Sequence, residues 1–148
     1  YQMLVKRQAL DYLRVSICVC GGFTGAKKIA AIAEANPIGI IPHNPLSPVA
    51  TAACIQFDAA TPSFTIQEYP DPDGPAAHAR FVFEKTGKSA FRASDIVNVM
   101  PECRDGFLVV PDAPGIGIEL VEGVEEKFPF ERRKVVTRLT TDGAVMDQ

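Results

Sequence analysis

Two side chains that can move protons follow two neighbouring apolar segments of the chain. His43 comes directly after the apolar residues 38–42, and Glu68 ends the next apolar segment, residues 64–68. In parallel α/β folds, active sites form at the carboxyl ends of the strands. An oriented imidazole can take a proton from carbon near neutral pH, and a carboxylate beside it completes a two-residue site. From position alone, a structural or solvent-exposed role stays open for both residues.

Three short apolar runs predict the strands that would bring these side chains together, at residues 12–18, 38–42 and 64–68. Largely apolar strands of this length fit a parallel sheet that is covered by helices. We therefore predict three parallel strands with the intervening helices on one side. A Rossmann-like sheet and a barrel both stay open at this point. Gly21-Gly22 lacks the spacing of a dinucleotide-binding turn and is better explained as a tight turn.

Helices are predicted at residues 24–35 and 48–59, after the end of a first helix in residues 2–10. Thr24 can cap the first of the two, whereas Ser47-Pro48 supplies a cap and a proline at the first helical position of the second. Each helix has an apolar face with helical spacing. The predicted buried residues are Ala26, Ile29, Ala30 and Ala33 in the first, and Val49, Ala50, Ala53, Cys54 and Phe57 in the second.

Residues 71–148 are richer in proline, glycine and charge, and their pattern is weaker. Residues 70–75 form a turn cluster. Its Asp71, Asp73 and Gly74 lack the later glutamate of a calcium loop, and His78 is interpreted as a surface residue. The stretch 76–94 stays ambiguous between a helix and a loop. The remaining predictions are a strand at 107–110, a turn at 114–117, a helix at 121–127 and a final strand at 135–139.

The composition of the 148 residues is typical of a globular protein, with a formal net charge of −3. No basic run supports a nucleic-acid surface, and no apolar stretch approaches the ~18 residues of a membrane span. We therefore expect neither a nucleic acid nor a membrane as partner. The cysteines show no zinc-binding spacing and are interpreted as small apolar residues in a reducing cytoplasm. They are Cys18 and Cys20, predicted on one face of a strand, Cys54 and Cys103.

Several motifs resemble the mandelate racemase branch of the enolase superfamily, and within it the galactonate and mannonate dehydratases. The resemblance covers nearly the whole chain, being strongest in residues 12–70 and 107–130 and weak in 71–106. Its motifs are Gly21-Gly22-Phe23-Thr24, Pro42-His43-Asn44-Pro45-Leu46-Ser47-Pro48, Ile66-Gln67-Glu68-Tyr69 and Pro114-Gly115-Ile116-Gly117-Ile118-Glu119. Together these motifs are specific to the superfamily, whereas each one alone is weak.

The resemblance implies an α/β fold, the C-terminal half of a TIM-like (β/α)7β barrel with a C-terminal extension that packs toward a capping domain. Residues 1–70 would be the last βα units of the barrel, and residues 71–148 the C-terminal loop and extension. The capping domain and the first barrel strands are expected upstream of Tyr1, together with the three carboxylates that hold Mg²⁺. No metal ligand is expected within this chain.

The function implied by the resemblance is that of a Mg²⁺-dependent acid-sugar dehydratase. A base removes the proton α to the carboxylate, the enediolate is stabilised, and loss of the β-hydroxyl as water gives a 2-keto-3-deoxy acid. His43 and Glu68 are the expected catalytic residues, and Asn44 and Ser16 the expected substrate-binding residues. A racemase or epimerase of the same superfamily and a non-catalytic barrel fragment are the alternatives. The implied partner is a small acid sugar, and the full-length protein is expected to be a cytoplasmic homo-oligomer.

Ser16 departs from the pattern of the galactonate dehydratases, which carry an aspartate at this point of the sixth strand. A serine offers no negative charge to hold an imidazolium, so His43 would be a weaker base. Mannonate dehydratases have a small hydroxyl residue at about this point. Whether His43 acts as the base or binds substrate therefore stays open. We also expect the 148-residue chain alone to be inactive and to bind Mg²⁺ poorly.

Overall fold

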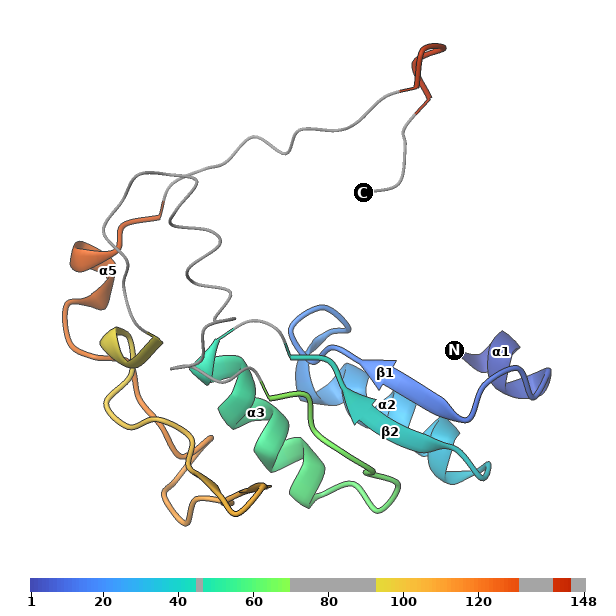
Figure 1. The fold of residues 1–148 in the computed structure, drawn as a ribbon, viewed down its shortest axis with the longest axis horizontal. Helices are drawn as coiled ribbons and strands as arrows, with labels where there is room; N and C mark the ends of the chain where they lie inside the picture. The colour runs from blue at the N-terminus through green and yellow to red at the C-terminus, as the bar shows by residue number, and fades with distance from the viewer. Residues whose placement is uncertain (45–46, 70–92, 131–139, 145–148) are drawn as a thin grey trace.

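The computed structural model describes residues 1–44, 47–69, 93–130 and 140–144. Helices and strands alternate through the first part of the chain, and a small hairpin and two short helical turns follow (Figure 1). The elements are α1 (Gln2–Lys6), β1 (Tyr12–Val15), α2 (Gly22–Glu34), β2 (Gly39–Pro42), α3 (Pro48–Ala59), the 3₁₀ turn η1 (Ala93–Asp95), β3 (Cys103–Arg104), β4 (Phe107–Leu108) and α5 (Val124–Lys127).

The strands β1 and β2 are parallel, with Leu13 opposite Ile40 and Val15 opposite Pro42. On its other side, Ile40 forms a parallel bridge with Phe64. The predicted parallel order of the three segments is thus confirmed, with β2 in the middle. The predicted third strand at 64–68 is reduced to this one bridge. A physical reason is that Pro42 has no N–H group with which to continue the ladder.

The first strand is shorter than predicted, because the chain turns immediately after Val15. The N–H groups of Val19 and Cys20 both donate to the carbonyl of Ser16, at 3.1 and 2.9 Å. The prediction that Cys18 and Cys20 share one face of a strand is therefore wrong, since both lie in this turn. The turn ends at Gly21-Gly22, whose φ angles of 98° and 68° are those that glycine adopts without strain.

Helix α2 covers one face of the two strands, behind them in the view of Figure 1. Its side chains Ala26, Ala30 and Ala33 are fully buried and Ile29 is partly buried, as the apolar spacing predicts. The helix begins earlier than predicted, with Gly21 rather than Thr24 as its N-cap. Small alanine side chains allow the helix to approach the strands closely. The core that results also contains residues of α1, β1, β2 and α3, namely Val5, Leu13, Val15, Ile40, Cys54 and Phe57.

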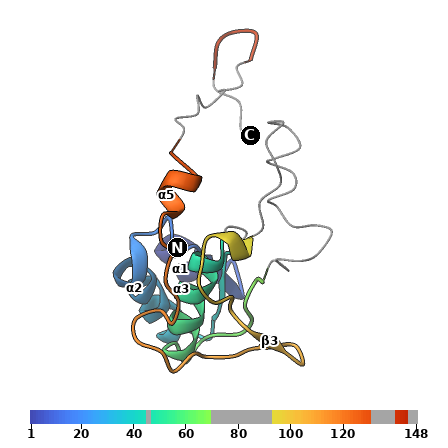
Figure 2. The same ribbon diagram turned by 90° about the vertical axis from the view of Figure 1, so that its left-hand side faces the viewer.

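Helix α3 begins and ends as predicted, with Pro48 at its first position and the Ser47 hydroxyl accepting from the Ala50 N–H at 3.2 Å. Both helices thus lie on the same side of the strands, and Figure 2 shows them from a second direction. Burial extends beyond the predicted face of α3, because Thr51, Ala52 and Ile55 are buried as well. Ala52 and Ile55 face residues 99–118, so α3 lies between the core and the C-terminal segment. A helix that is buried nearly all round carries little periodicity for prediction.

The C-terminal half contains less regular structure than predicted. The strand predicted at 107–110 is the short β4, which pairs with β3 in an antiparallel hairpin, and the helix predicted at 121–127 begins only at Val124. The turn at 114–117 is confirmed by the hydrogen bond from the Gly117 N–H to the Pro114 carbonyl. The predictions for residues 70–92 and 135–139, including His78 and the Asp71-Asp73 turn, lie outside the described residues. Within the described residues, no helix is long and apolar enough to cross a membrane.

A mostly apolar cavity of about 490 Å³ lies between α3, residues 64–67 and the β3–β4 hairpin, with the carboxyl group of Asp58 in its wall. Burial raises the pKa of Asp58 to about 7. One carboxylate oxygen, Oδ1, is buried without a hydrogen-bond partner among the described residues. Ionised Asp58 is therefore a cost to the folded state at neutral pH.

Replacing Asp58 should make the stability of the protein depend less on pH. Because the pKa of Asp58 is about 7 in the folded state and 3.8 in its ordinary state, the folded state holds the proton more tightly. Stability therefore falls as pH rises from about 4 to about 7. Asp58→Asn keeps the group neutral and should raise stability above pH 7 by about 1 to 4 kcal/mol, with no gain near pH 4. Melting temperatures at both pH values measure this, and an equal effect at both would contradict it.

Candidate functional site

The carboxyl ends of β1 and β2 bring His43 and Ser16 together. The His43 N–H donates to the Val15 carbonyl at 2.7 Å, which extends the ladder by one step beyond the pair Val15–Pro42. In this register Ser16 and His43 are neighbours on the face opposite the helices. Both line a shallow hollow of about 580 Å³, whose remaining wall consists of Tyr1, Arg14, Val19 and Cys20. The sequence thus correctly predicted that His43 stands at the end of a buried strand.

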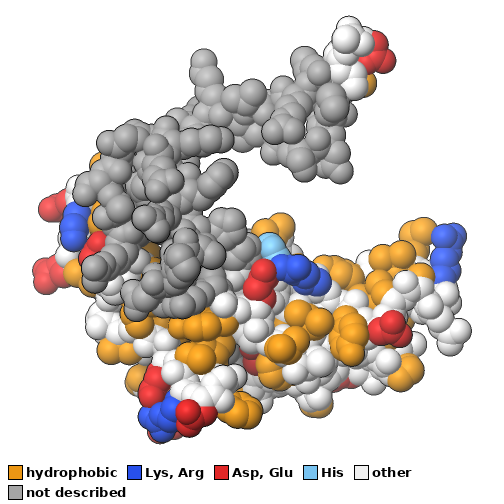
Figure 3. Space-filling model, viewed as in Figure 1, with side chains coloured by type: hydrophobic (Ala, Val, Ile, Leu, Met, Phe, Trp, Pro, Cys, Tyr) orange, Lys and Arg blue, Asp and Glu red, His pale blue; other side chains and the backbone are white. Residues whose placement is uncertain are grey.

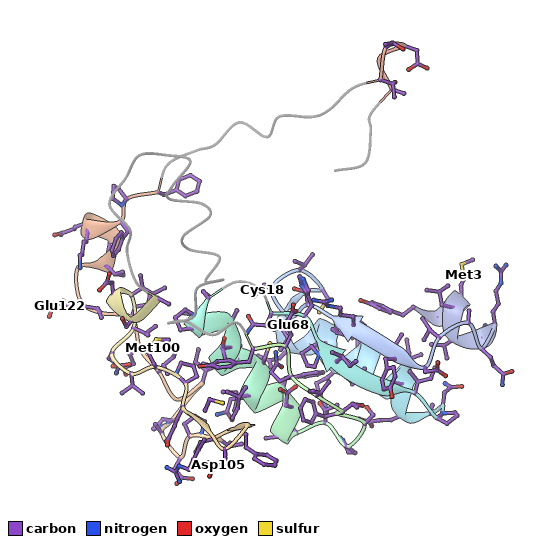
Figure 4. The ribbon with its side chains drawn as sticks, viewed as in Figure 1. Met3, Cys18, Glu68, Met100, Asp105 and Glu122 are labelled. Atoms are coloured by element: carbon purple, nitrogen blue, oxygen red, sulfur yellow. The ribbon has the colours of Figure 1, made fainter. Side chains whose placement is uncertain are left out.

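Glu68 stands at the same edge, where Figure 4 labels it beside the ends of the two strands. Its Oε2 atom accepts two hydrogen bonds, one from the Arg14 guanidinium at 2.6 Å and one from the Asn44 N–H at 2.8 Å. In the space-filling view, histidine, basic and acidic side chains meet here on the surface (Figure 3). The structure therefore brings His43 and Glu68 to one edge of the sheet, although Glu68 is held by side-chain contacts and not by a strand ladder.

The contacts of Glu68 determine its ionisation. Partial burial by itself raises the pKa of Glu68, but the Asn44 N–H, the Arg14 guanidinium and His43 together lower it below its ordinary value. Glu68 is therefore a carboxylate at neutral pH. In that form it accepts hydrogen bonds and stabilises nearby positive charge, but it has no proton to donate.

Asn44 lies behind the hollow and not in its wall. Its side chain is fully buried, and its amide nitrogen donates to the Thr51 hydroxyl at 2.7 Å. The prediction that Asn44 binds substrate stays a prediction. The contacts seen in the structure are with Glu68 and Thr51, and they hold the end of β2 in place.

Ser16 lies in the wall of the hollow beside His43, and its hydroxyl oxygen is buried without a partner among the described residues. An unpaired buried hydroxyl is costly unless another group bonds to it. The position is compatible with a hydrogen bond to the imidazole or to a bound hydroxyl. Its prediction as a substrate-binding residue stays a prediction.

Arg14 belongs to the site and was not predicted from the sequence. A signal for it was present, because Arg14 is the one charged residue in the strand Tyr12–Val15, where Leu13 and Val15 are buried. Strand alternation then turns Arg14 to the same face as Ser16. A charged side chain that points away from the helices, one residue before the strand end, indicates a functional or ion-paired residue.

Burial favours the protonated thiol at two of the cysteines near the site, Cys20 and Cys54. Burial raises the pKa of Cys20, which lines the hollow, and raises that of the buried Cys54 to about 12. Only a thiolate reacts or ligates readily. In the part of the chain that the structure describes, no three His, Cys, Asp or Glu side chains form a group that could hold a metal ion.

The family model described as enolase C-terminal domain-like matches residues 1–124. Among curated proteins, the chain is 33% identical over 148 residues to a D-galactonate dehydratase family member of Streptomyces bingchenggensis, and 30% identical over 152 residues to a D-mannonate dehydratase of Caulobacter vibrioides. Each alignment covers 99% of this chain and 32% of the relative. The chain thus spans about a third of the length of these relatives.

Two solved structures that match the chain are enolases. An enolase of Pantoea ananatis with bound D-gluconate and Mg is 32% identical at a TM-score of 0.69, over 88% of this chain and 28% of that one. An enolase of Agrobacterium radiobacter with bound Na and L-malate is 30% identical at a TM-score of 0.73, over 97% of this chain and 36% of that one.

Glu68→Gln should destabilise the protein near neutral pH and much less at low pH. The folded pKa of Glu68 lies below its ordinary 4.5, so the stabilisation by the carboxylate is present above that value and is lost as pH falls. Arg14 and Glu68 are 58% and 34% exposed, so solvent limits the effect to about 1 kcal/mol. Melting temperatures at about pH 7 and pH 4 measure it. Glu34→Gln, at an exposed position on α2, is the control and should change neither melting temperature. An equal fall in melting temperature at both pH values for Glu68→Gln would count against the ion pair.

Proposed function

We propose that this chain, which belongs to the enolase C-terminal domain-like family, is the C-terminal part of a Mg²⁺-dependent acid-sugar dehydratase. The observation that carries the proposal is the placement of His43 and Glu68 at the ends of neighbouring parallel segments. The relatives named galactonate and mannonate dehydratases support the substrate class. We further propose that residues 1–70 complete a (β/α)7β barrel and that residues 71–148 form an extension toward a capping domain.

The reaction is the loss of water from a 2,3-dihydroxy acid. The proton on carbon 2 goes to a base, and the hydroxyl group on carbon 3 takes a proton from an acid and leaves as water. The enol that remains tautomerises to the 2-keto-3-deoxy acid. When bound, Mg²⁺ supplies a Lewis acid for the substrate carboxylate. The described residues contain no group for that ion, and we propose that its ligands lie outside this chain, as the resemblance implies.

The two candidate catalytic residues differ in what they can do. Glu68 is ionised and paired with Arg14, so it is suited to accept hydrogen bonds from sugar hydroxyls or to offset a positive charge on His43. The imidazole of His43 can both take and return a proton, and its backbone is fixed by Val15. We therefore assign proton transfer to His43. The Ser16 hydroxyl, directly after β1 and without a partner among the described residues, is available to bond to the imidazole.

The proposal also covers the activity of the 148-residue chain alone and the assembly of the whole protein. Because the chain spans about a third of its relatives, we propose that it is inactive alone and binds Mg²⁺ poorly. Among the described residues β1 pairs with β2 alone, and an open strand edge needs a partner, which supports this proposal. We also propose a cytoplasmic homo-oligomer that acts on small acid sugars.

The full-length protein should dehydrate an acid sugar and lose that activity when the metal is removed. Incubation with aldonic and aldaric acids, with detection of the 2-keto-3-deoxy product, measures the reaction. A chelator should abolish turnover and Mg²⁺ should restore it. If the product is epimerised substrate and not a keto acid, the protein is a racemase or epimerase and the dehydratase proposal is wrong. The 148-residue chain is the matched comparison and should show no turnover.

His43→Asn in the full-length enzyme should lower kcat by about 10²–10⁴-fold with a smaller change in KM, because it removes the proton-transfer group but keeps a polar side chain. A raised KM with little change in kcat would show that His43 binds substrate instead. Ser16→Asp adds a carboxylate beside His43, which favours the imidazolium, so the acidic limb of the pH–rate profile should move to higher pH. If His43→Asn leaves kcat and KM unchanged, His43 has no role in the reaction and its assignment is wrong.

A further inference from the structure

Asn44 is a polar side chain that the fold buries completely, directly after His43. It is among the largest fully buried side chains of the described residues. Asparagine is mostly exposed in proteins, and a buried one is expected to have all its polar atoms bonded. Its Oδ1 atom, however, has no partner among the described residues. The burial of Asn44 therefore costs stability, and stability alone does not explain why an amide stands here.

The bonded atoms of Asn44 connect the site to helix α3. Its backbone N–H donates to Glu68 Oε2 at 2.8 Å, and its side-chain nitrogen donates to Thr51 Oγ1 at 2.7 Å. The Thr51 hydroxyl in turn donates to the Ser47 carbonyl at 3.1 Å, at the first turn of α3. A continuous series of hydrogen bonds thus runs from the Glu68 carboxylate through Asn44 to the beginning of the helix.

The same residue restricts His43. The His43 N–H is bonded to Val15 on one side, and Asn44 holds the chain on the other side through its two bonds. The peptide that carries the imidazole is therefore fixed at both ends, one by the strand ladder and one by α3. A change at Asn44 would alter the positions of His43 and Glu68 together.

We infer that Asn44 is a positioning residue, which sets the placement of His43 relative to Glu68 by tying the end of β2 to Thr51 of α3. The inference rests on the proposed function for its kinetic consequences. It assigns Asn44 no contact with the substrate. Arg14 of β1 also bonds to the Glu68 carboxylate, at 2.6 Å, but this contact does not replace the bond from Asn44 to Thr51.

The test breaks the link from both ends in the full-length enzyme. Asn44→Ala removes the donor and Thr51→Val removes the acceptor with little change of volume. The matched control is Thr61→Val at the other end of α3, because Thr61 is also buried and its hydroxyl also bonds to the carbonyl four residues earlier, that of Phe57 at 2.6 Å. Thr51→Val and Thr61→Val thus lose the same kind of helix bond, and only the first loses the contact with Asn44.

Each of Asn44→Ala and Thr51→Val should lower kcat by about 10- to 100-fold, since small displacements of reacting groups cost that much. The double variant should be no slower than the slower single variant, because both changes break one link. Thr61→Val should stay within about twofold of the parent. A loss in Thr61→Val as large as in Thr51→Val, losses that multiply in the double variant, or an unchanged Asn44→Ala enzyme would each overturn the inference.

Crystal structures of the full-length variants separate this inference from the proposed function. In Asn44→Ala and Thr51→Val the distance from the backbone nitrogen at position 44 to Glu68 Oε2 should increase beyond the ~3.5 Å of a hydrogen bond, and in Thr61→Val it should not. If the parent protein turns over no acid sugar, the proposed function fails, but this distance still tests the positioning. An unchanged distance in both site variants would refute it.

Discussion

The backbone ladder between the parallel strands β1 and β2 is the interaction on which the site depends. Its register sets Val15 opposite Pro42 and thereby places Ser16 beside His43. A slip of one residue would turn His43 toward the helices, because side chains alternate between the faces of a strand. The buried side chains of Leu13, Val15 and Ile40 oppose such a slip, since a shift of one residue would turn buried side chains to the other face of the sheet.

Pro42 ends the ladder on the other side of β2 and changes how Glu68 is held. Ile40 bonds to both Ser63 and Thr65 through its backbone, but Pro42 has no N–H group to offer the next residues. The side chain of Gln67 donates to the Pro42 carbonyl at 3.4 Å, where a ladder bond could have formed. The position of Glu68 is therefore determined by Arg14 and Asn44, and the geometry of the site depends on side-chain contacts that a backbone register does not provide.

Apolar periodicity and capping residues made part of the fold and of the site predictable from the sequence. Ser47-Pro48 predicted the bounds of α3, the alanines of α2 predicted its buried face, and the apolar runs before His43 and Glu68 predicted their positions. The early end of β1 was not predictable, because Ile17 is as apolar as the strand residues and the turn is made by backbone bonds to Ser16. The burial of Asn44 was not predictable from the sequence either, because the amide is buried only where α3 packs against the end of β2.

The two carboxylate oxygens of Glu68 differ in their contacts. Oε2 accepts from both Arg14 and Asn44, so one oxygen fixes the side chain, and among the described residues Oε1 has no bonded partner. An ionised oxygen in that position can accept a hydrogen bond from a substrate hydroxyl without loosening the side chain, because its anchor is a separate atom. Arg14 neutralises part of the negative charge of Glu68, and the neutral Ser16 adds no charge to the site. Under the proposed function, the described part of the site offers a fixed acceptor and the His43 imidazole with little net charge. The negative charge that develops on a substrate carboxylate would then be stabilised by groups beyond the described residues.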